Sequence, residues 1–100
     1  MALYEVNVMK AELKVKGGKL LKVECSVEND LIKDVRFTGD FFLTPEESIF
    51  RLEEALKGIR AREEEIARRV DAFFRTENVT LIGLNPVHFV EVIMLALKGV

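Results

Sequence analysis

Two side chains of this 100-residue chain have chemistry of their own, the single cysteine and the single histidine. Cys25 lies in a run where apolar and polar residues alternate, and it shares the apolar positions with Leu21 and Val23. A reactive thiol requires access and nearby positive charge, so this position predicts a buried, inert thiol. His88 has Glu91 one helical turn away but no neighbouring nucleophile, which favours a surface histidine over a proton relay.

The sequence has no motif for a metal or a nucleotide. One cysteine and one histidine cannot fill a tetrahedral zinc shell, and no phosphate-binding glycine loop is present. Gly17-Gly18 is too short for such a loop and suits a hairpin turn. We therefore expect no metal and no cofactor on this chain alone. Lys19, directly after the turn, is a candidate cation for a partner's phosphate or carboxylate.

The charge balance excludes some classes of partner. The chain has 17 acidic and 15 basic residues, and phosphate backbones are bound by clustered Lys and Arg, so we expect no nucleic acid. No apolar run reaches the ~20 residues of a membrane helix, and the N-terminus lacks the order of a signal peptide. These features predict a cytoplasmic protein without membrane contact. Many Glu, Lys and Arg and no Gln are typical of thermophilic proteins.

The hydrophobic pattern predicts strands first and helices afterwards. Residues 6–38 alternate with a period of two, and helical spacing begins at Thr44. Turn residues at Gly17-Gly18 and Asn29-Asp30 divide the first part into three strands. A chain of this length suits one core. We predict one α+β domain over residues 1–100, a three-stranded antiparallel meander followed by three helices packed on one face.

Two of the predicted strands change parity. In the first strand the apolar positions are even up to Val8 and odd from Met9, which predicts a bulge or a break between them. In the third strand Leu31 continues the apolar face that includes Val35, although Ile32 could pack instead.

Capping residues set the predicted helix boundaries. Thr44 suits an N-cap, Pro45 the first helical position and Glu47 the third, while Gly58 suits the end of this helix. The second helix is predicted over residues 61–75, with one apolar and one charged face.

The third predicted helix runs from Asn85-Pro86 to Lys98. It has two adjacent apolar stripes, and a small domain cannot easily surround such a helix. We expect another chain to cover the surplus. The stripes contain Val87, Val90, Ile93, Met94 and Leu97, and Phe89, Val92 and Ala96.

The segment between the last strand and the first helix is the most informative one. Phe41 and Phe42 are adjacent, and neighbouring side chains of an extended segment point to opposite sides, so at least one ring is available for another contact. Gly39 permits a sharp bend, and Asp40 can accept backbone N–H groups or direct its charge at a ligand. A structural corner and a contact surface both remain open.

The sequence also resembles a known family. The accessory domain of lipoate-protein ligases is similar over about residues 9–99, and many archaeal ligases are split into two proteins. Because the chain begins with Met1 and has no catalytic half, it resembles the separately encoded small subunit. The family's fold is also similar to that of sulfur-transfer and iron–sulfur scaffold proteins. The segments that carry the resemblance are Gly18-Lys19-Leu20-Leu21-Lys22-Val23, Ile32-Lys33-Asp34-Val35, Thr38-Gly39-Asp40-Phe41-Phe42, Pro45-Glu46-Glu47 and Leu52-Glu53-Glu54-Ala55-Leu56-Lys57-Gly58.

The resemblance implies an accessory role without a catalytic residue. In these ligases the large subunit binds lipoate and ATP, with magnesium, and the small subunit is needed to form lipoyl-AMP. The lipoyl group then passes to a lysine of an acceptor domain. The implied partners are the large catalytic subunit and, transiently, lipoyl acceptor domains. We expect the partner interface to consist of Gly39, Asp40, Phe41, Phe42 and Lys19, and the mechanism to be closure over the large subunit's pocket.

Two other functions stay open. A sulfur-transfer or iron–sulfur scaffold-like protein would use Cys25 as a persulfide carrier, and this requires an accessible thiol. A plain protein-interaction module would dimerise through the third helix.

Overall fold

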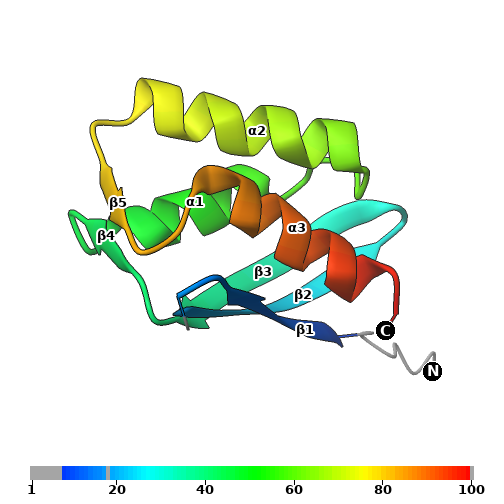
Figure 1. Ribbon diagram of the computed structural model, residues 1–100. Coiled ribbons are helices and arrows are strands. Elements are labelled where there is room, and N and C mark those ends of the chain that lie inside the picture. Colours follow the sequence, from blue (N-terminus) through cyan, green and yellow to red (C-terminus); the bar gives the residue numbers. More distant parts are fainter. Residues whose placement is uncertain (1–7, 18, 100) are drawn as a thin grey trace.

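A computed structural model describes residues 8–17 and 19–99 (Figure 1). It confirms the predicted α+β class, a three-stranded antiparallel meander followed by three helices. In chain order the elements are β1 (Val8–Val15), β2 (Lys19–Glu28), β3 (Leu31–Gly39), β4 (Phe42–Thr44), α1 (Ser48–Leu56), α2 (Glu63–Thr76), β5 (Thr80–Ile82) and α3 (Pro86–Leu97).

The helices all lie on one side of the β1-β2-β3 sheet, as Figure 1 shows. α3 packs on β1 and β2, and α1 packs on β3. α2 packs on α1 and α3 and forms the outermost layer. The core lies between the sheet and the first helical layer, where Leu21, Val23 and Cys25 of β2 are almost completely buried.

The predicted hairpin turns are only partly visible. Asn29 and Asp30 both adopt positive φ, as expected for the tight turn between β2 and β3. Gly17 has φ +99°, whereas Gly18, the other half of the predicted first turn, lies outside the described residues.

The predicted bulge between Val8 and Met9 is wrong. These residues pair regularly with Ser26 and Cys25, and the residues before Val8 lie outside the described part. The observed irregularity lies between Ser26 and Val27, where β2 pairs with β3. This register shift brings Ile32 into the core and leaves the side chain of Leu31 40% exposed.

The first helix begins at Ser48 rather than at Pro45. Thr44, the predicted N-cap, belongs to β4 and pairs with Thr80 of β5. The residues between them form a turn, in which the N–H of Ser48 donates to the Pro45 carbonyl at 2.9 Å. A strand pairing with a distant segment therefore overrides a local capping signal. Gly58 follows the helix with φ +84°, as predicted.

Residues 58–61 cover one end of the β3 edge before α2 starts. The N–H of Ile32 donates to the Ile59 carbonyl at 2.9 Å, and the N–H of Gly58 donates to the Ile32 carbonyl at 2.7 Å. Ala61 in turn donates to the Asp30 carbonyl, so α2 begins at Glu63, two residues later than predicted.

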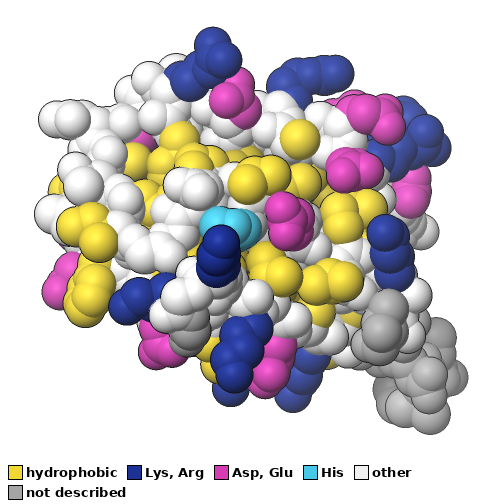
Figure 2. Space-filling model, in the orientation of Figure 1, with side chains coloured by type: hydrophobic (Ala, Val, Ile, Leu, Met, Phe, Trp, Pro, Cys, Tyr) yellow, Lys and Arg dark blue, Asp and Glu magenta, His cyan; other side chains and the backbone are white. Residues whose placement is uncertain are grey.

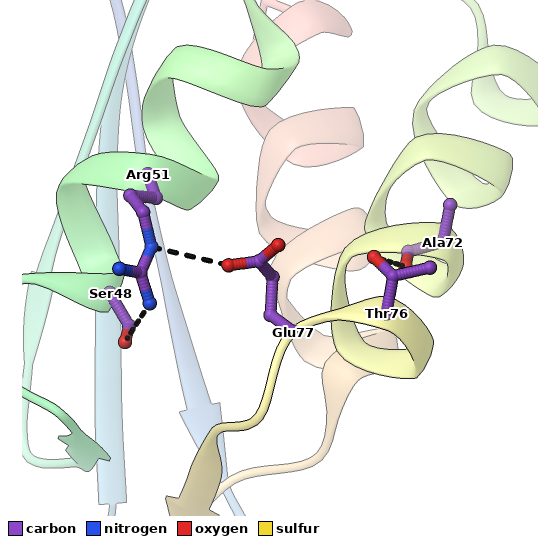
Figure 3. A network of polar contacts seen from close by, with 5 residues as sticks. All are labelled: Ser48, Arg51, Ala72, Thr76 and Glu77. Atoms are coloured by element: carbon purple, nitrogen blue, oxygen red, sulfur yellow. Dashed lines mark hydrogen bonds and ion pairs between the residues drawn. The ribbon is translucent and has the colours of Figure 1, made fainter.

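The two-stranded ribbon formed by β4 and β5 was not predicted. Its strands have three residues each, too few for a clear alternating pattern. Arg51 of α1 holds the base of the ribbon, because its Nε lies 3.3 Å from a carboxylate oxygen of Glu77 (Figure 3). The same guanidinium donates to Ser48 Oγ at 3.1 Å. Glu77 directly follows α2, so this network joins the segment before β5 to the helix after β4.

α3 buries more of its surface than the sequence suggested. Members of both predicted stripes are packed in the core, against the sheet and α2. Val87 is exposed, and Met94 and Leu97 are half-buried. The expected apolar surplus is therefore small. In the described ranges, no helix has both the length and the apolar character that a membrane crossing requires.

A buried carboxylate attaches α1 to the edge of β3. Glu53, which sequence reasoning missed, accepts a hydrogen bond of 2.8 Å from the backbone N–H of Phe37. Burial raises the pKa of the Glu53 carboxyl, against the opposing influence of this hydrogen bond and of Arg36. The bond satisfies a strand N–H that faces a helix instead of another strand.

The raised pKa of Glu53 predicts a pH-dependent stability. The folded chain binds the Glu53 proton more tightly than the unfolded chain, so this contribution is complete below the ordinary pKa of 4.5 and is lost as pH rises through the raised value. Glu53→Gln keeps the acceptor and removes the titration. We expect urea unfolding between pH 4 and pH 7 to show a smaller loss of stability in this variant than in the wild type.

Glu53→Ala is the matched control, because it leaves the Phe37 N–H without an acceptor. This variant should lose about 1–3 kcal/mol at every pH. Identical pH profiles of the wild type and Glu53→Gln would contradict the assignment.

Candidate partner interface

The two phenylalanines of the corner point to opposite sides, as expected for an extended segment. Phe41 is half-buried, and its ring meets the ring of Phe89 edge to face, with 5.5 Å between the centroids. The side chain of Phe42 is 69% exposed. The structure thus combines the structural corner with the contact surface. The ring of Phe41 fixes the corner in the core, and the ring of Phe42 is available for a contact.

The bend at Gly39 requires a glycine. Its φ is +150°, and a Cβ at this position would collide with the carbonyl oxygen of Leu20. The same carbonyl accepts the backbone N–H of Asp40 at 2.8 Å. Gly39 and Leu20 therefore lie in close backbone contact at the end of the β2–β3 pairing, and beyond this contact the chain leaves the sheet toward β4 (Figure 1).

The ribbon continues the exposed surface that starts at Phe42. Phe42 and Ile82 are directly opposite each other in β4 and β5, and the side chain of Ile82 is 59% exposed. The next pair, Leu43 and Leu81, faces inward. Two large apolar side chains thus lie side by side in solvent. Sequence reasoning missed Ile82, because the only signal was a three-residue apolar alternation after Asn78.

Lys19 and Asp40 lie in one hollow beside this pair. The hollow has a volume of about 380 Å³, and it is lined by Gly17, Lys19, Gly39, Asp40, Phe41 and Phe42. Gly83, directly after β5, lies against it, because a Cβ there would be 3.7 Å from Lys19 Cε and 3.4 Å from the Asp40 carbonyl oxygen. The fold therefore brings together all five predicted interface residues, although Lys19 is far from the others in sequence.

The charged groups of the hollow are available to a partner. Lys19 and Asp40 are both exposed, and within the described part of the chain neither side chain forms an ion pair. Among the described residues the Asp40 carboxylate accepts none of the hydrogen bonds expected of it in the turn; the backbone N–H of Asp40 donates to the Leu20 carbonyl. An apolar pair next to a cation and an anion suits recognition of another protein surface.

The two reactive side chains are placed elsewhere. Cys25 is 1% exposed, and burial raises the pKa of its thiol, which opposes thiolate formation. His88 accepts a hydrogen bond of 2.9 Å at Nδ1 from the N–H of Asn85, as part of the α3 N-terminus. No three His, Cys, Asp or Glu side chains of residues 8–17 and 19–99 cluster as metal ligands would.

Comparison with known proteins decides the family. The family model described as "Bacterial lipoate protein ligase C-terminus" matches residues 8–93. The chain belongs to this family. The lipoate-protein ligase A subunit 2 of Thermoplasma acidophilum is 36% identical over 78 residues, which are 78% of this chain and 79% of that protein.

A solved structure agrees with the assignment to the ligase family. It was described as a structural analysis of an archaeal lipoylation system, a bi-partite lipoate protein ligase and its E2 lipoyl domain from Thermoplasma acidophilum. The match has a TM-score of 0.77 at 30% identity, and it covers 89% of this chain and 97% of the other. The sulfur-transfer alternative is not favoured, since the family match and the buried thiol both oppose it.

The close contact between Gly39 and Leu20 predicts that alanine substitutions at Gly39 and at Gly17 differ strongly in their effect on stability. Gly39→Ala should destabilise the fold by at least about 2 kcal/mol, because it combines backbone strain with a collision against Leu20. Gly17→Ala has open space around its Cβ and should lose only about 1 kcal/mol through its positive φ. Urea unfolding of both variants measures the difference. Equal losses of unfolding free energy in the two variants would contradict the close contact between Gly39 and Leu20.

The burial of Cys25 predicts slow alkylation. Iodoacetamide should label the native protein at least about a hundredfold more slowly than the unfolded chain, because the thiol is reached only when the fold opens. Mass spectrometry with and without guanidinium measures both rates, and the single cysteine makes the label unambiguous. Rapid labelling of the native protein would revive the persulfide hypothesis.

Proposed function

We propose that this chain is the small accessory subunit of a bipartite lipoate-protein ligase. With a separate large catalytic subunit it supports ATP-dependent adenylation of lipoate and lipoylation of acceptor-domain lysines. The observation that carries the proposal is the extent of the match, since this chain aligns with 79% of a ligase subunit 2 and with 97% of a chain solved from a bipartite ligase. Such coverage indicates a counterpart of a whole subunit rather than a shared fragment.

The surface chemistry supports a docking role. Exposed neighbouring apolar side chains such as Phe42 and Ile82 mark sites where proteins associate. Their backbone is rigid, because the ribbon is attached to α1 through Arg51 and to the core through the ring of Phe41. A rigid apolar surface loses little conformational entropy on binding. We infer that the ribbon and the adjoining hollow face the large subunit.

Closure explains how such a subunit assists without a catalytic residue. Lipoate and ATP, with magnesium, bind to the large subunit in this proposal, and lipoyl-AMP forms there in the cytoplasm. A domain docked over that pocket excludes water, which strengthens the electrostatic contacts around the anionic intermediate. Among the described residues that line the hollow, Lys19 is the one cation, and it suits an anionic group on the facing surface. Lipoyl acceptor domains are the transient second partner.

The ribbon face predicts which substitutions abolish activity. Phe42→Ala combined with Ile82→Ala removes two exposed side chains and should leave the fold intact. Binding to the large subunit should weaken at least tenfold, because buried aromatic and aliphatic anchors carry most of an interface's energy. The measurements are titration calorimetry with the large subunit and formation of lipoyl-AMP from lipoate and ATP.

Phe50→Ala provides the matched control. Phe50 is also a largely exposed phenylalanine, at 63%, but it lies on α1 and lines a different hollow with Val8 and Arg36. This variant should keep full activity. Full activity of the double variant, or synthesis of lipoyl-AMP by this chain alone, would refute the proposed function.

A further inference from the structure

The outer edge of β1 has no partner strand in the described part of the chain. β1 is an edge strand of the three-stranded sheet, and its eight residues pair with β2 on one side only. The opposite edge, at β3, is covered by residues 58–61 and by the Glu53 carboxylate. An uncovered strand offers a row of N–H and C=O groups for pairing with another strand.

The apolar side chains of β1 are only partly buried. Met9, Ala11, Leu13 and Val15 face the helix-covered side of the sheet but stay half-buried. The β2 partners of Met9, Ala11 and Leu13 are almost completely buried, with Cys25 at 1%, Val23 at 1% and Leu21 at 0%. Among residues 8–17 and 19–99, none covers these side chains beyond β1, where a further strand would stand.

The charges on the open face of β1 alternate in sign. Lys10 forms an ion pair of 3.7 Å with Glu24, and Lys22 forms one of 3.5 Å with Glu12. Each pair joins opposite positions of β1 and β2. Charged side chains, lysine above all, commonly discourage pairing at a sheet edge. β1 carries Lys10 and Lys14 together with Glu12, so a second copy is repelled where like charges face each other and attracted where Lys lies opposite Glu. When a second β1 strand runs antiparallel to the first, the alternating charges of the two strands can therefore lie opposite charges of the other sign.

We propose that two copies of this chain associate through antiparallel pairing of their β1 strands, with Ala11 opposite Ala11 at the twofold axis. In this register Lys10 of each copy lies opposite Glu12 of the other, twice by symmetry. Each row of charges then alternates in sign across the two sheets. It runs from Glu24 and Lys10 of one copy to Glu12 and Lys22 of the other. On the covered face Met9 of one copy lies opposite Leu13 of the other, so apolar side chains meet apolar ones.

The neighbouring registers are unfavourable. Moving the twofold axis by one residue, to Lys10 or to Glu12, keeps the two faces of the sheet matched. The residue on the axis would then lie opposite the same residue of the other copy, so that two like charges face each other. A shift that moves the axis between two residues mixes the covered face with the open face. An axis at Leu13 also matches the faces and sets Glu12 opposite Lys14, but it pairs only residues 11–15, whereas the axis at Ala11 pairs residues 8–14. The axis at Ala11 is thus the register that pairs opposite charges over the longest stretch of β1.

The position of α3 allows this pairing. α3 packs on β1 and β2, so its axis lies close to the boundary between these strands. With strands about 4.8 Å apart, the two copies of α3 would lie about 10 Å apart across the axis, the usual spacing of packed helices. Figure 2 views the side formed by α3 and β1 and shows hydrophobic side chains between charged groups there. Leu95, half-buried on α3, is one apolar side chain of that helix left to cover.

The proposed dimer is independent of the proposed function. Phe42 and Ile82 belong to the other sheet, formed by β4 and β5, so the ribbon stays available for a large subunit in each copy. Failure of one proposal leaves the other in place, because each is tested by its own variants.

Complementary charge variants test the pairing. Sedimentation equilibrium of the full chain should show a species of twice 11.4 kDa. Lys10→Glu and Glu12→Lys each place like charges opposite one another, and each should weaken self-association about tenfold or more. An equimolar mixture of the two variants restores opposite charges at both contacts. The mixture should therefore dimerise nearly as tightly as the wild type.

Lys33→Glu is the matched control. It breaks an exposed ion pair, Lys33 with Glu28 at 2.8 Å, on β3 rather than on β1, and it should leave dimerisation unchanged. Circular dichroism verifies that all the variants fold. A chain that is monomeric up to millimolar concentration, a dimer that survives both single reversals, or a mixture that stays monomeric would overturn the proposal.

Discussion

The packing around the ring of Phe89 holds the proposed partner interface in place. This ring is completely buried at the start of α3, and it contacts Phe37 of β3, Phe41 of the corner and Phe74 of α2, with centroid distances of 4.9, 5.5 and 5.9 Å. It therefore joins the sheet, the outer helix and the segment leading to the ribbon. Because interiors are close-packed, the corner cannot shift without moving this cluster.

The orientation of Phe42 follows from that contact. Phe41 is held inward by Phe89, and alternation along the extended backbone then directs Phe42 outward. The pairing of β4 with β5 adds Ile82 beside it, and the Arg51–Glu77 contact holds the base of the ribbon. An exposed apolar pair is thus a consequence of core packing and strand geometry, and it is as rigid as the core to which it is attached. This rigidity suits a subunit that acts by covering another protein's pocket.

Local patterns predicted the features that depend on neighbouring residues. Alternation placed Cys25 in the core, the turn residues located Asn29 and Asp30, and Asn85-Pro86 marked the start of α3. The errors at Thr44 and Glu53 involve distant contacts. Thr44 has good N-cap chemistry but pairs with Thr80, and Glu53 looks like a surface residue but accepts the N–H of Phe37. Of the candidate site, the corner and Lys19 were predictable, whereas Ile82 required knowledge of a strand pairing 40 residues apart, between Phe42 and Ile82.

The two edges of the main sheet show how the same problem is solved in different ways. At β3, segment 58–61 and Glu53 satisfy backbone groups within the chain, at the cost of burying a carboxylate. At β1, alternating charges and half-buried apolar side chains are left on an open edge. Evolution commonly blocks such edges, since unpaired strands promote uncontrolled association. In the proposed pairing the charges of this edge match those of its own reversed copy, which favours one closed, twofold association and leaves the ribbon of each copy free.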